Sequence, residues 1–277
     1  MSVIEGTNIP KTIYMCFKHK RIPPKVIGNW QRLNPDFRVF LFDDNDCIQF
    51  LMQYYGPQFV HIFKSIPDGA IKSDFWRVCI LYKLGGVYAD VDIEPVVPIS
   101  NFVEEDIHML TCHSMWAPKF SGRGSDTMNP HFIAVCPGSS ILKKCVDKYL
   151  NLLGQSKYDY WVWSITGIMA AALRDVTQGD NIVDKQSNIT TDNGLKLQFL
   201  KEQGPGGEII AGDSPLVGCY YNGKEVLKNR YADYKHWSVR TESEVKRRNA
   251  TNVGIKGIGP LRRTNMSKWE SSNMRRF

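Results

Sequence analysis

The sequence has none of the features that place a protein in a membrane or in the secretory pathway. Its apolar runs are only a few residues long, whereas a membrane-spanning helix needs about 20, and residues 1–20 contain no apolar core of a signal peptide. We therefore expect a cytoplasmic protein that is soluble or bound peripherally to a membrane. Hydrophobic residues still make up 43% of the 277 positions, which is enough for a full core and predicts one elaborated domain.

The seven cysteines and six histidines lack the spacing of a metal or redox site. The cysteines lie far apart, their number is odd, and they include no Cys-X-X-Cys pair. This pattern is typical of reduced, mostly buried thiols. No two histidines are paired at metal-ligand spacing, and a structural role is the default for His19, His61, His108, His113 and His131.

Excess positive charge is absent from most of the chain and concentrated near its end. From Lys228 onward there are 13 Lys/Arg against 4 Asp/Glu, a net charge of +9, whereas the preceding residues carry −2. Such a segment is either a solvated tail or a contact for an anionic ligand, a membrane surface or nucleic acid. We expect a folded domain over residues 1–240 and a basic tail over residues 241–277 that packs on it or extends from it.

No internal repeat interrupts the alternation of strand and helix patterns along the chain. Strands are predicted at residues 11–17, 37–42, 86–92, 107–112 and 131–136. Helices are predicted at residues 23–33, 46–55, 57–65, 68–84, 139–152 and 164–175. This alternation predicts an α/β fold with a mostly parallel sheet. Residues 178–208 and 240–277 are polar and irregular, so we expect a surface excursion and a tail there.

A short acidic stretch follows the longest predicted helix. Gly85 is placed to end that helix, and in the strand that follows, period two puts Asp90, Asp92 and Glu94 on one side. Like charges this close persist only in water or around a cation. A solvated edge strand is the usual cause of such a pattern, and a site for Mg²⁺ or Mn²⁺ is the functional alternative. Because ligands bind beyond the carboxyl ends of strands in open α/β sheets, the position favours the cation site.

The preceding helix carries a second polar group. Asp74 and Arg77 are three residues apart and share one helix face, beside Ser73. A surface ion pair and a ligand site explain this pair equally well. The combination of the pair with an acidic strand end predicts a binding site.

The same helix and strand resemble a known signature. Residues 70–96 read AIKSDFWRVCILYKLGGVYADVDIEPV, which is similar to the signature of glycosyltransferase family 32 and related sugar-transferring toxins: SD, two residues, R, then L, GG, an apolar residue, Y, one residue and DXD. Weaker similarity to the family continues at residues 9–17, 29–44, 129–142, 164–173 and 234–239. The resemblance implies a glycosyltransferase-A catalytic domain, with a Rossmann-like, mostly parallel sheet flanked by helices, over residues 1–240.

The resemblance also implies a metal-dependent hexosyltransferase that retains anomeric configuration. Asp92 would ligate Mn²⁺, or Mg²⁺, and Asp90 would contact the ribose and support the metal. His236, in a late motif with imperfect spacing, is a further metal ligand candidate. Trp161 and Trp163 alternate as on a strand or extended loop, and we expect them in the core or at the rim of a site.

The other site residues implied by the resemblance concern the donor. Asp74 and Arg77 would hold the hydroxyls of the donor sugar, beside Ser73, and both are expected to be catalytic together with the acidic pair. Tyr88 would line the nucleotide pocket, and Phe17 would stack on the base. A UDP-hexose is the expected donor and GDP-mannose an alternative, with a glycan, a lipid or a protein as acceptor.

Two other classes of function remain open. Residues 253–263, VGIKGIGPLRR, are similar to the hairpin of helix-hairpin-helix modules, and with the basic tail they would suit a nucleic-acid-binding protein. A transferase fold that binds glycans without catalysis is the other alternative, but the intact SD, R and DXD set argues against it. We expect no nucleic-acid partner, and we expect that the basic tail can make a peripheral membrane contact.

Overall fold

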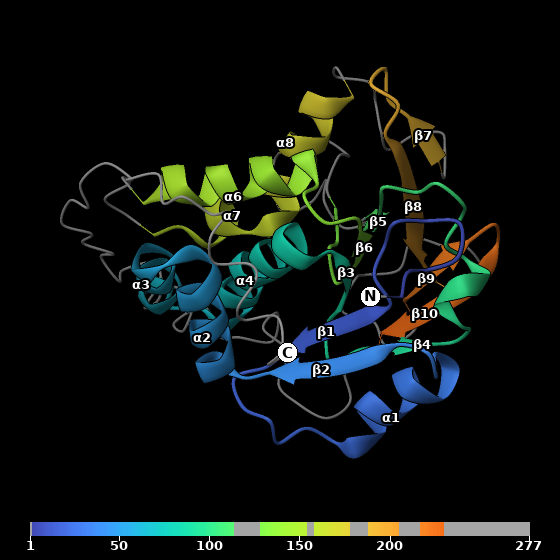
Figure 1. The fold of residues 1–277 in the computed structure, drawn as a ribbon, viewed down its shortest axis with the longest axis horizontal. Helices are drawn as coiled ribbons and strands as arrows, with labels where there is room; N and C mark the ends of the chain where they lie inside the picture. Colours follow the sequence, from blue (N-terminus) through green and yellow to red (C-terminus); the bar gives the residue numbers. More distant parts are fainter. Residues whose placement is uncertain (1, 114–127, 154–157, 178–187, 205–216, 230–277) are drawn as a thin grey trace.

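The computed structural model describes residues 2–113, 128–153, 158–177, 188–204 and 217–229, which form an α/β body (Figure 1). The strands are β1 Thr12–Cys16, β2 Arg38–Phe42, β3 Gly86–Ala89, β4 Ile93–Pro95, β5 Met109–His113, β6 Phe132–Val135, β7 Asn188–Thr190, β8 Lys196–Gln203, β9 Gly218–Tyr221 and β10 Lys224–Asn229. The helices are α1 Pro24–Leu33, α2 Asp44–Tyr55, α3 Pro57–Ser65, α4 Gly69–Leu84, α6 Ser140–Leu152, α7 Tyr160–Trp163 and α8 Ile165–Val176, with a 3₁₀ turn at Ile99–Asn101. The elements predicted up to residue 175 are confirmed, with ends that differ by at most three residues.

One mixed sheet contains the ten strands that the structure describes. Its order is β2-β1-β3-β6-β5-β8-β9-β10-β4, and β7 pairs with β8. The pairs β1–β2, β1–β3 and β5–β8 are parallel, and the other described pairs are antiparallel. The predicted α/β class is therefore confirmed, whereas the parallel, Rossmann-like arrangement is continuous only over β2-β1-β3. The direction first changes at the antiparallel pair β3–β6. Further along the sheet, β9 and β10 form a hairpin through Asn222 and Gly223, both at positive φ.

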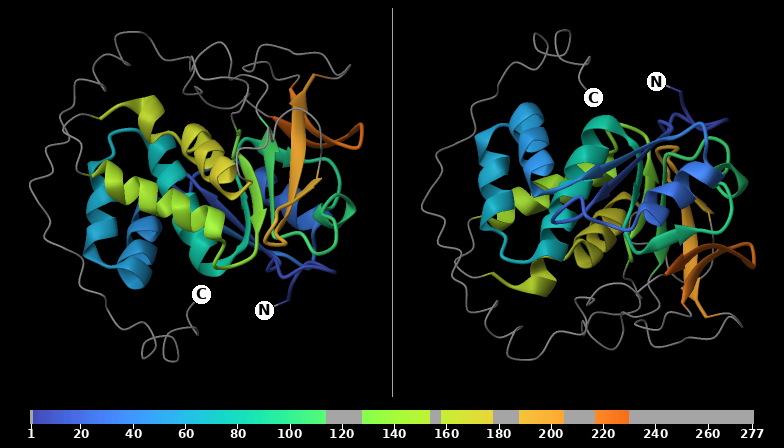
Figure 2. Two further views of the ribbon diagram at one scale, coloured as in Figure 1. Left: turned by 90° about the horizontal axis from the view of Figure 1, so that it is seen from above. Right: turned by 90° about the horizontal axis from the view of Figure 1, so that it is seen from below.

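Two apolar cores lie on opposite faces of the sheet (Figures 1 and 2). The first core packs the sheet against α2, α3, α4, α6 and α8, and the second includes Trp30 of α1. Side chains alternate along β1 as its period of two requires: Tyr14 and Cys16 enter the first core, and Ile13 and Met15 the second. The helices of the first core stand beside the carboxyl ends of β1 and β3, where they can wall a site.

The structure corrects the prediction of a surface excursion at residues 178–208. Within this range, β8 is a central strand that pairs with β5, β7 and β9. Gln198 and Glu202 are 0% and 2% exposed, although both are polar. The Gln198 side chain donates to the Phe102 carbonyl and accepts from the Glu104 N–H, so the sheet buries residues that the sequence presents as hydrophilic.

Several predictions concern residues outside the described ranges. These are the basic tail at 241–277, the glycine-rich stretch at 253–263, and His236 with the late motif around it. Among the described residues, no helix combines the length and the apolar character needed to cross a membrane. All seven cysteines are free, and six of them are buried, which confirms the prediction of mostly buried thiols.

Candidate active site

A cavity of about 370 Å³ opens where β1 and β3 end. This volume lies within the range typical of small-molecule sites. Side chains from α4, from the loops after both strands and from the start of α8 meet in it. Its lining includes Phe17, Lys18, Lys72, Ser73, Asp74, Arg77, Asp90, Asp92, Asn129, Pro130, Trp161, Ser164 and Thr166. The structure thus brings together six of the predicted site residues, from Phe17 to Asp92, in one place.

The junction of α4 and β3 sets the position of the acidic residues. Asp68 caps the start of α4 by accepting a hydrogen bond from the Ala70 N–H at 3.1 Å, and Gly85 ends the helix at a φ of +63°. Gly86 follows at a φ of +100°, and a Cβ there would lie 2.8 Å from the Thr12 carbonyl oxygen. Only glycine fits this approach between β3 and β1. The prediction that Gly85 ends the helix is confirmed.

The acidic residues lie in a turn and not along a strand. Strand β3 ends at Ala89, and the Ile93 N–H donates to the Asp90 carbonyl at 3.1 Å, so that residues 90–92 form what we call the acidic turn. The prediction that Asp90, Asp92 and Glu94 project from one strand face is therefore wrong. Glu94 lies in β4 and accepts a hydrogen bond from Asn29 at 2.6 Å, away from the cavity lining. The predicted location of the acidic pair at a strand end is confirmed.

Arg77 connects α4 to the acidic turn. Its Nη2 lies 3.1 Å from Asp74 Oδ1 and 3.1 Å from Asp90 Oδ1, and its Nη1 donates to the Pro130 carbonyl at 2.6 Å. The guanidinium also stacks over the Tyr88 ring at 4.3 Å. Because Arg77 is only 5% exposed, the pair with Asp74 is a buried network and not the surface ion pair that the sequence left open.

Burial and charge act in opposite directions on this network. Burial raises the pKa of Asp74 to about 6, although the Arg77 guanidinium and the Ile165 N–H, which donates to Asp74 Oδ2 at 3.1 Å, oppose the rise. Burial by itself would lower the pKa of Arg77, but the charges of Asp90 and Asp74 and the Tyr88 phenol outweigh it and raise the pKa. Arg77 therefore stays charged, and Asp74 is ionised at neutral pH.

Tyr88 holds the acidic turn from behind. Its hydroxyl donates to Asp90 Oδ1 at 2.6 Å, and the residue is 0% exposed and does not belong to the cavity lining. The structure therefore corrects the prediction that Tyr88 lines a nucleotide pocket. Its hydroxyl bond orients Asp90, whereas the half-buried Phe17 lines the cavity just after the end of β1.

Some lining residues were missed or underrated in the sequence. Trp161 is 44% exposed at the cavity, and Trp163 is buried, because both lie on the short helix α7 and not on a strand or extended loop. Lys18 follows Phe17 directly and adds positive charge to the lining. Asn129 and the Pro130 carbonyl enter from the segment before β6, which weak similarity at 129–142 already marked.

The acidic turn fits a hard divalent cation. Both Asp90 and Asp92 line the cavity, and carboxylate oxygens are the ligands that Mg²⁺ and Mn²⁺ prefer. Arg77 and Tyr88 occupy Oδ1 of Asp90, and among the described residues none donates to its other oxygen, Oδ2. The network thus fixes one carboxylate oxygen and presents the second.

A known family model covers the part of the chain that carries the acidic turn. Residues 24–109 match a family model described as a glycosyltransferase sugar-binding region containing a DXD motif. The resemblance to DXD glycosyltransferases is confirmed over this region. It contains α4, β3 and the acidic turn, whose residues 90–92 have the DXD form, and it includes Asp74, Arg77 and Tyr88.

Similar proteins include mannosyltransferases. The initiation-specific alpha-1,6-mannosyltransferase of Candida albicans is 28% identical over 115 residues, which are 38% of this chain and 30% of the relative. The inositol phosphoceramide mannosyltransferase 3 of Schizosaccharomyces pombe is 35% identical over 92 residues, 32% of this chain and 26% of the relative. A solved structure, the PaToxG glycosyltransferase, has a TM-score of 0.49 and 20% identity over 63% of this chain and 73% of that chain. The chain spans about a third or less of the length of these two curated relatives.

Proposed function

We propose that this chain is a metal-dependent, retaining glycosyltransferase that moves a mannosyl group from a nucleotide-sugar to a glycan, lipid or protein acceptor. The observation that carries the proposal is the buried Arg77, which joins Asp74 to the acidic turn inside one cavity. Two relatives are named mannosyltransferases, so GDP-mannose takes precedence over the UDP-hexose expected from the sequence.

Different residues of the cavity would bind different parts of the donor. Asp92 and Asp90 would hold Mn²⁺ or Mg²⁺, and the ion would supply positive charge to the diphosphate as it leaves. Asp74 reaches the cavity from α4 and would accept hydrogen bonds from sugar hydroxyls, while Arg77 keeps its carboxylate in place. Phe17 would stack on the base beyond the end of β1.

The transfer itself requires no protein base in this scheme. The bond between the anomeric carbon and the phosphate oxygen breaks, and the acceptor oxygen bonds to the same face of that carbon. Because the new bond forms on the face from which the phosphate leaves, the configuration is retained. The acceptor hydroxyl gives its proton to the departing phosphate oxygen, so charge balances. The chain contributes by holding donor and acceptor in register and by fixing the carboxylates beforehand.

Mn²⁺-dependent hydrolysis of a nucleotide-sugar panel tests this function. Wild-type protein should hydrolyse GDP-mannose slowly with Mn²⁺ and not with a chelator present. Asp92→Asn should lower the rate by about 100-fold or more and leave the unfolding curve unchanged. Asp147→Asn, which removes only an exposed ion pair to Lys143 on α6, is the matched control and should retain full activity.

Other results would point to the alternatives. Glycan binding without hydrolysis of any donor would favour a non-catalytic transferase fold. Donor-independent DNA binding that weakens with salt would favour a nucleic-acid-binding protein that uses the basic tail. Hydrolysis of a UDP-hexose and not of GDP-mannose would support a glycosyltransferase with a different donor.

A further inference from the structure

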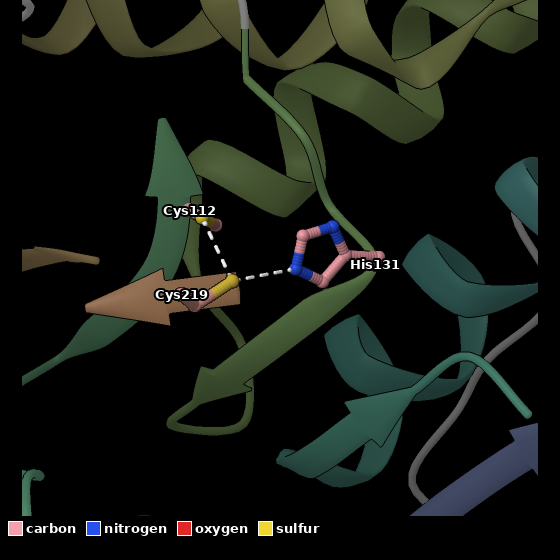
Figure 3. A group of neighbouring side chains, drawn as sticks. All are labelled: Cys112, His131 and Cys219. Atoms are coloured by element: carbon pink, nitrogen blue, oxygen red, sulfur yellow. Dashed lines mark hydrogen bonds between the residues drawn. The ribbon is translucent and has the colours of Figure 1, made fainter. Parts of the chain in front are cut away.

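Three potential metal ligands meet in the second core, on the face of the sheet that α1 covers. Figure 3 shows Cys219 between Cys112 and His131, with a dashed line to each. Cys219 Sγ lies 2.9 Å from His131 Nε2 and 3.4 Å from Cys112 Sγ, and all three ligand atoms lie within 4.8 Å of one another. The two cysteines are 0% exposed and the histidine 5%. We call this group the thiol–imidazole cluster.

Strand register assembles the cluster. In the parallel pair β5–β8, Cys112 is opposite Leu200, and in the antiparallel pair β8–β9, Glu202 is opposite Cys219. Because Leu200 and Glu202 are two positions apart on β8, they share a face, and so both thiols and the Glu202 side chain point to the same side of the sheet. His131 immediately precedes β6, the other neighbour of β5.

Glu202 gives an independent indication of an ion at this place. It is 2% exposed, and its Oε1 accepts a hydrogen bond from Asn129 Nδ2 at 2.9 Å. Its Oε2 is buried without a hydrogen-bond partner. A buried carboxylate oxygen without a donor is costly unless a cation lies nearby, and the directly opposite residue on β9 is a cluster thiol.

We propose that the thiol–imidazole cluster binds one Zn²⁺, with Glu202 as the fourth ligand. Two thiolates, an imidazole and a carboxylate form a ligand set that suits Zn²⁺, whereas Mg²⁺ and Mn²⁺ prefer oxygen. Tetrahedral Zn²⁺ with bonds of about 2.3 Å to sulfur and 2.0–2.1 Å to nitrogen would separate its ligand atoms by about 3.5–3.8 Å. The observed 2.9 and 3.4 Å therefore require outward shifts of a few tenths of an ångström, and the Glu202 carboxylate, which is not among the three atoms within 4.8 Å of one another, would have to turn toward the ion.

The ion would fix a segment shared with the active-site cavity. Asn129 bonds Glu202, Pro130 accepts from Arg77, and the His131 carbonyl accepts the Asp90 N–H at 2.9 Å. Asn129 and His131 thus have side chains at the proposed zinc site, and Pro130 and His131 have carbonyl groups bonded to Arg77 and Asp90. The Zn²⁺ is a structural support for the cavity and is separate from the cation of the acidic turn.

Metal binding by the purified chain tests the proposal. Reduced wild-type protein, stripped with a chelator, is titrated with Co²⁺ and then with Zn²⁺, and bound metal is counted. We expect one tightly bound equivalent that survives removal of loosely bound metal, a thiolate-to-cobalt charge-transfer band in the near ultraviolet, and displacement of Co²⁺ by Zn²⁺. Asp92→Asn should keep the tightly bound equivalent and the charge-transfer band, because it changes only the acidic turn.

Variants assign the ligands. Cys219→Ser should lose the charge-transfer band and stoichiometric zinc, whereas the matched control Cys145→Ser, also 0% exposed but in the first core, should keep both. Glu202→Gln should weaken zinc binding by about 10-fold or more, and unchanged affinity would overturn its assignment.

The wild-type titration decides the proposal even if a variant does not fold. Folded, reduced wild-type protein that takes up no stoichiometric zinc would overturn it. Isolation of the protein with a Cys112–Cys219 disulfide, and no zinc uptake after reduction, would also overturn it and would identify the pair as a redox site.

Discussion

The acidic turn and the thiol–imidazole cluster are attached to the same sheet but differ in nearly every physical respect. The acidic turn offers half-buried carboxylates at an open cavity, so a cation there can come and go with the substrate. The cluster offers soft ligands in a core that water does not reach, so an ion there would be retained. Burial and ligand type therefore determine whether a bound cation exchanges with solvent or is retained. Residues 129–131 connect the two sites.

The largest expected effect separates the two sites by stability. Removing metal with a strong chelator should lower the free energy of unfolding of the wild type by about 3 kcal/mol or more, since an ion present at 100 times its dissociation constant contributes that much. Asp92→Asn should lose the same amount, and Cys219→Ser should not respond further. Urea unfolding with and without chelator measures these changes in the free energy of unfolding. An equal loss in all three proteins would contradict the claim that the thiol–imidazole cluster holds the stabilising ion.

The next effect concerns the buried charge network. Arg77→Lys leaves one ammonium that cannot reach Asp74, Asp90 and the Pro130 carbonyl at once. We expect the free energy of unfolding to fall by about 3 kcal/mol and donor hydrolysis to be lost, because a buried carboxylate is left uncompensated. The matched control is Arg32→Lys on the exposed face of α1, which should change stability by less than about 0.5 kcal/mol.

Titration of Asp74 gives the cavity a pH dependence. Burial raises the pKa of Asp74 to about 6, so its carboxylate is lost as the pH falls through 6. Donor hydrolysis by the wild type should therefore decrease below about pH 6. Asp74→Asn should be slow at every pH and lack this step, and a wild-type rate that stays constant down to pH 5 would contradict the assignment.

The same group affects stability with the opposite trend. The folded-state pKa of about 6 exceeds the ordinary value of 3.8, so the folded protein binds this proton more strongly than the unfolded chain. The stabilising contribution is complete below pH 3.8 and is lost as the pH rises through 6, by up to about 3 kcal/mol. The free energy of unfolding, measured with urea, should fall between pH 3.8 and pH 6 in the wild type by more than it does in Asp74→Asn, which lacks the titrating group.

The smallest expected effect is on the orientation of Asp90. Tyr88→Phe keeps the ring beneath Arg77 and removes the hydroxyl that donates to Asp90 Oδ1. We expect a loss of about 1–2 kcal/mol in stability and a weaker affinity for Mn²⁺, because one donor to a charged oxygen is gone. Identical Mn²⁺ affinity in wild type and variant would show that Arg77 alone orients the carboxylate.

Local signals explain what the sequence could predict. The Asp68 cap, the apolar face of α4 and the Gly85-Gly86 pair act within a few residues of where they stand, and the structure confirms the helix and its junction with β3. The pairing of Asp74 with Arg77 also follows from helix geometry. Their combination with the acidic strand end already predicted a binding site, and the spacing of a known signature strengthened that prediction.

Distant pairing explains what the sequence could not predict. Strand β8 looked like a surface segment because Gln198 and Glu202 are polar, and their partners lie about 70 to 100 residues away. The cluster was hidden for the same reason, since Cys112 and Cys219 are 107 positions apart and only the sheet register joins them. The Asn222-Gly223 turn, by contrast, is a hairpin signal that was present in the sequence and was overlooked.

The central claim is that the acidic turn holds a cation that binds the donor's diphosphate. Calorimetric titration of the wild type and Asp92→Asn with GDP, with and without Mn²⁺, tests it most directly. We predict that wild type binds GDP at least about 10-fold more tightly with Mn²⁺, and that Asp92→Asn shows no such gain. Equal GDP affinity with and without Mn²⁺ in the wild type, or the same gain in Asp92→Asn, would contradict the account.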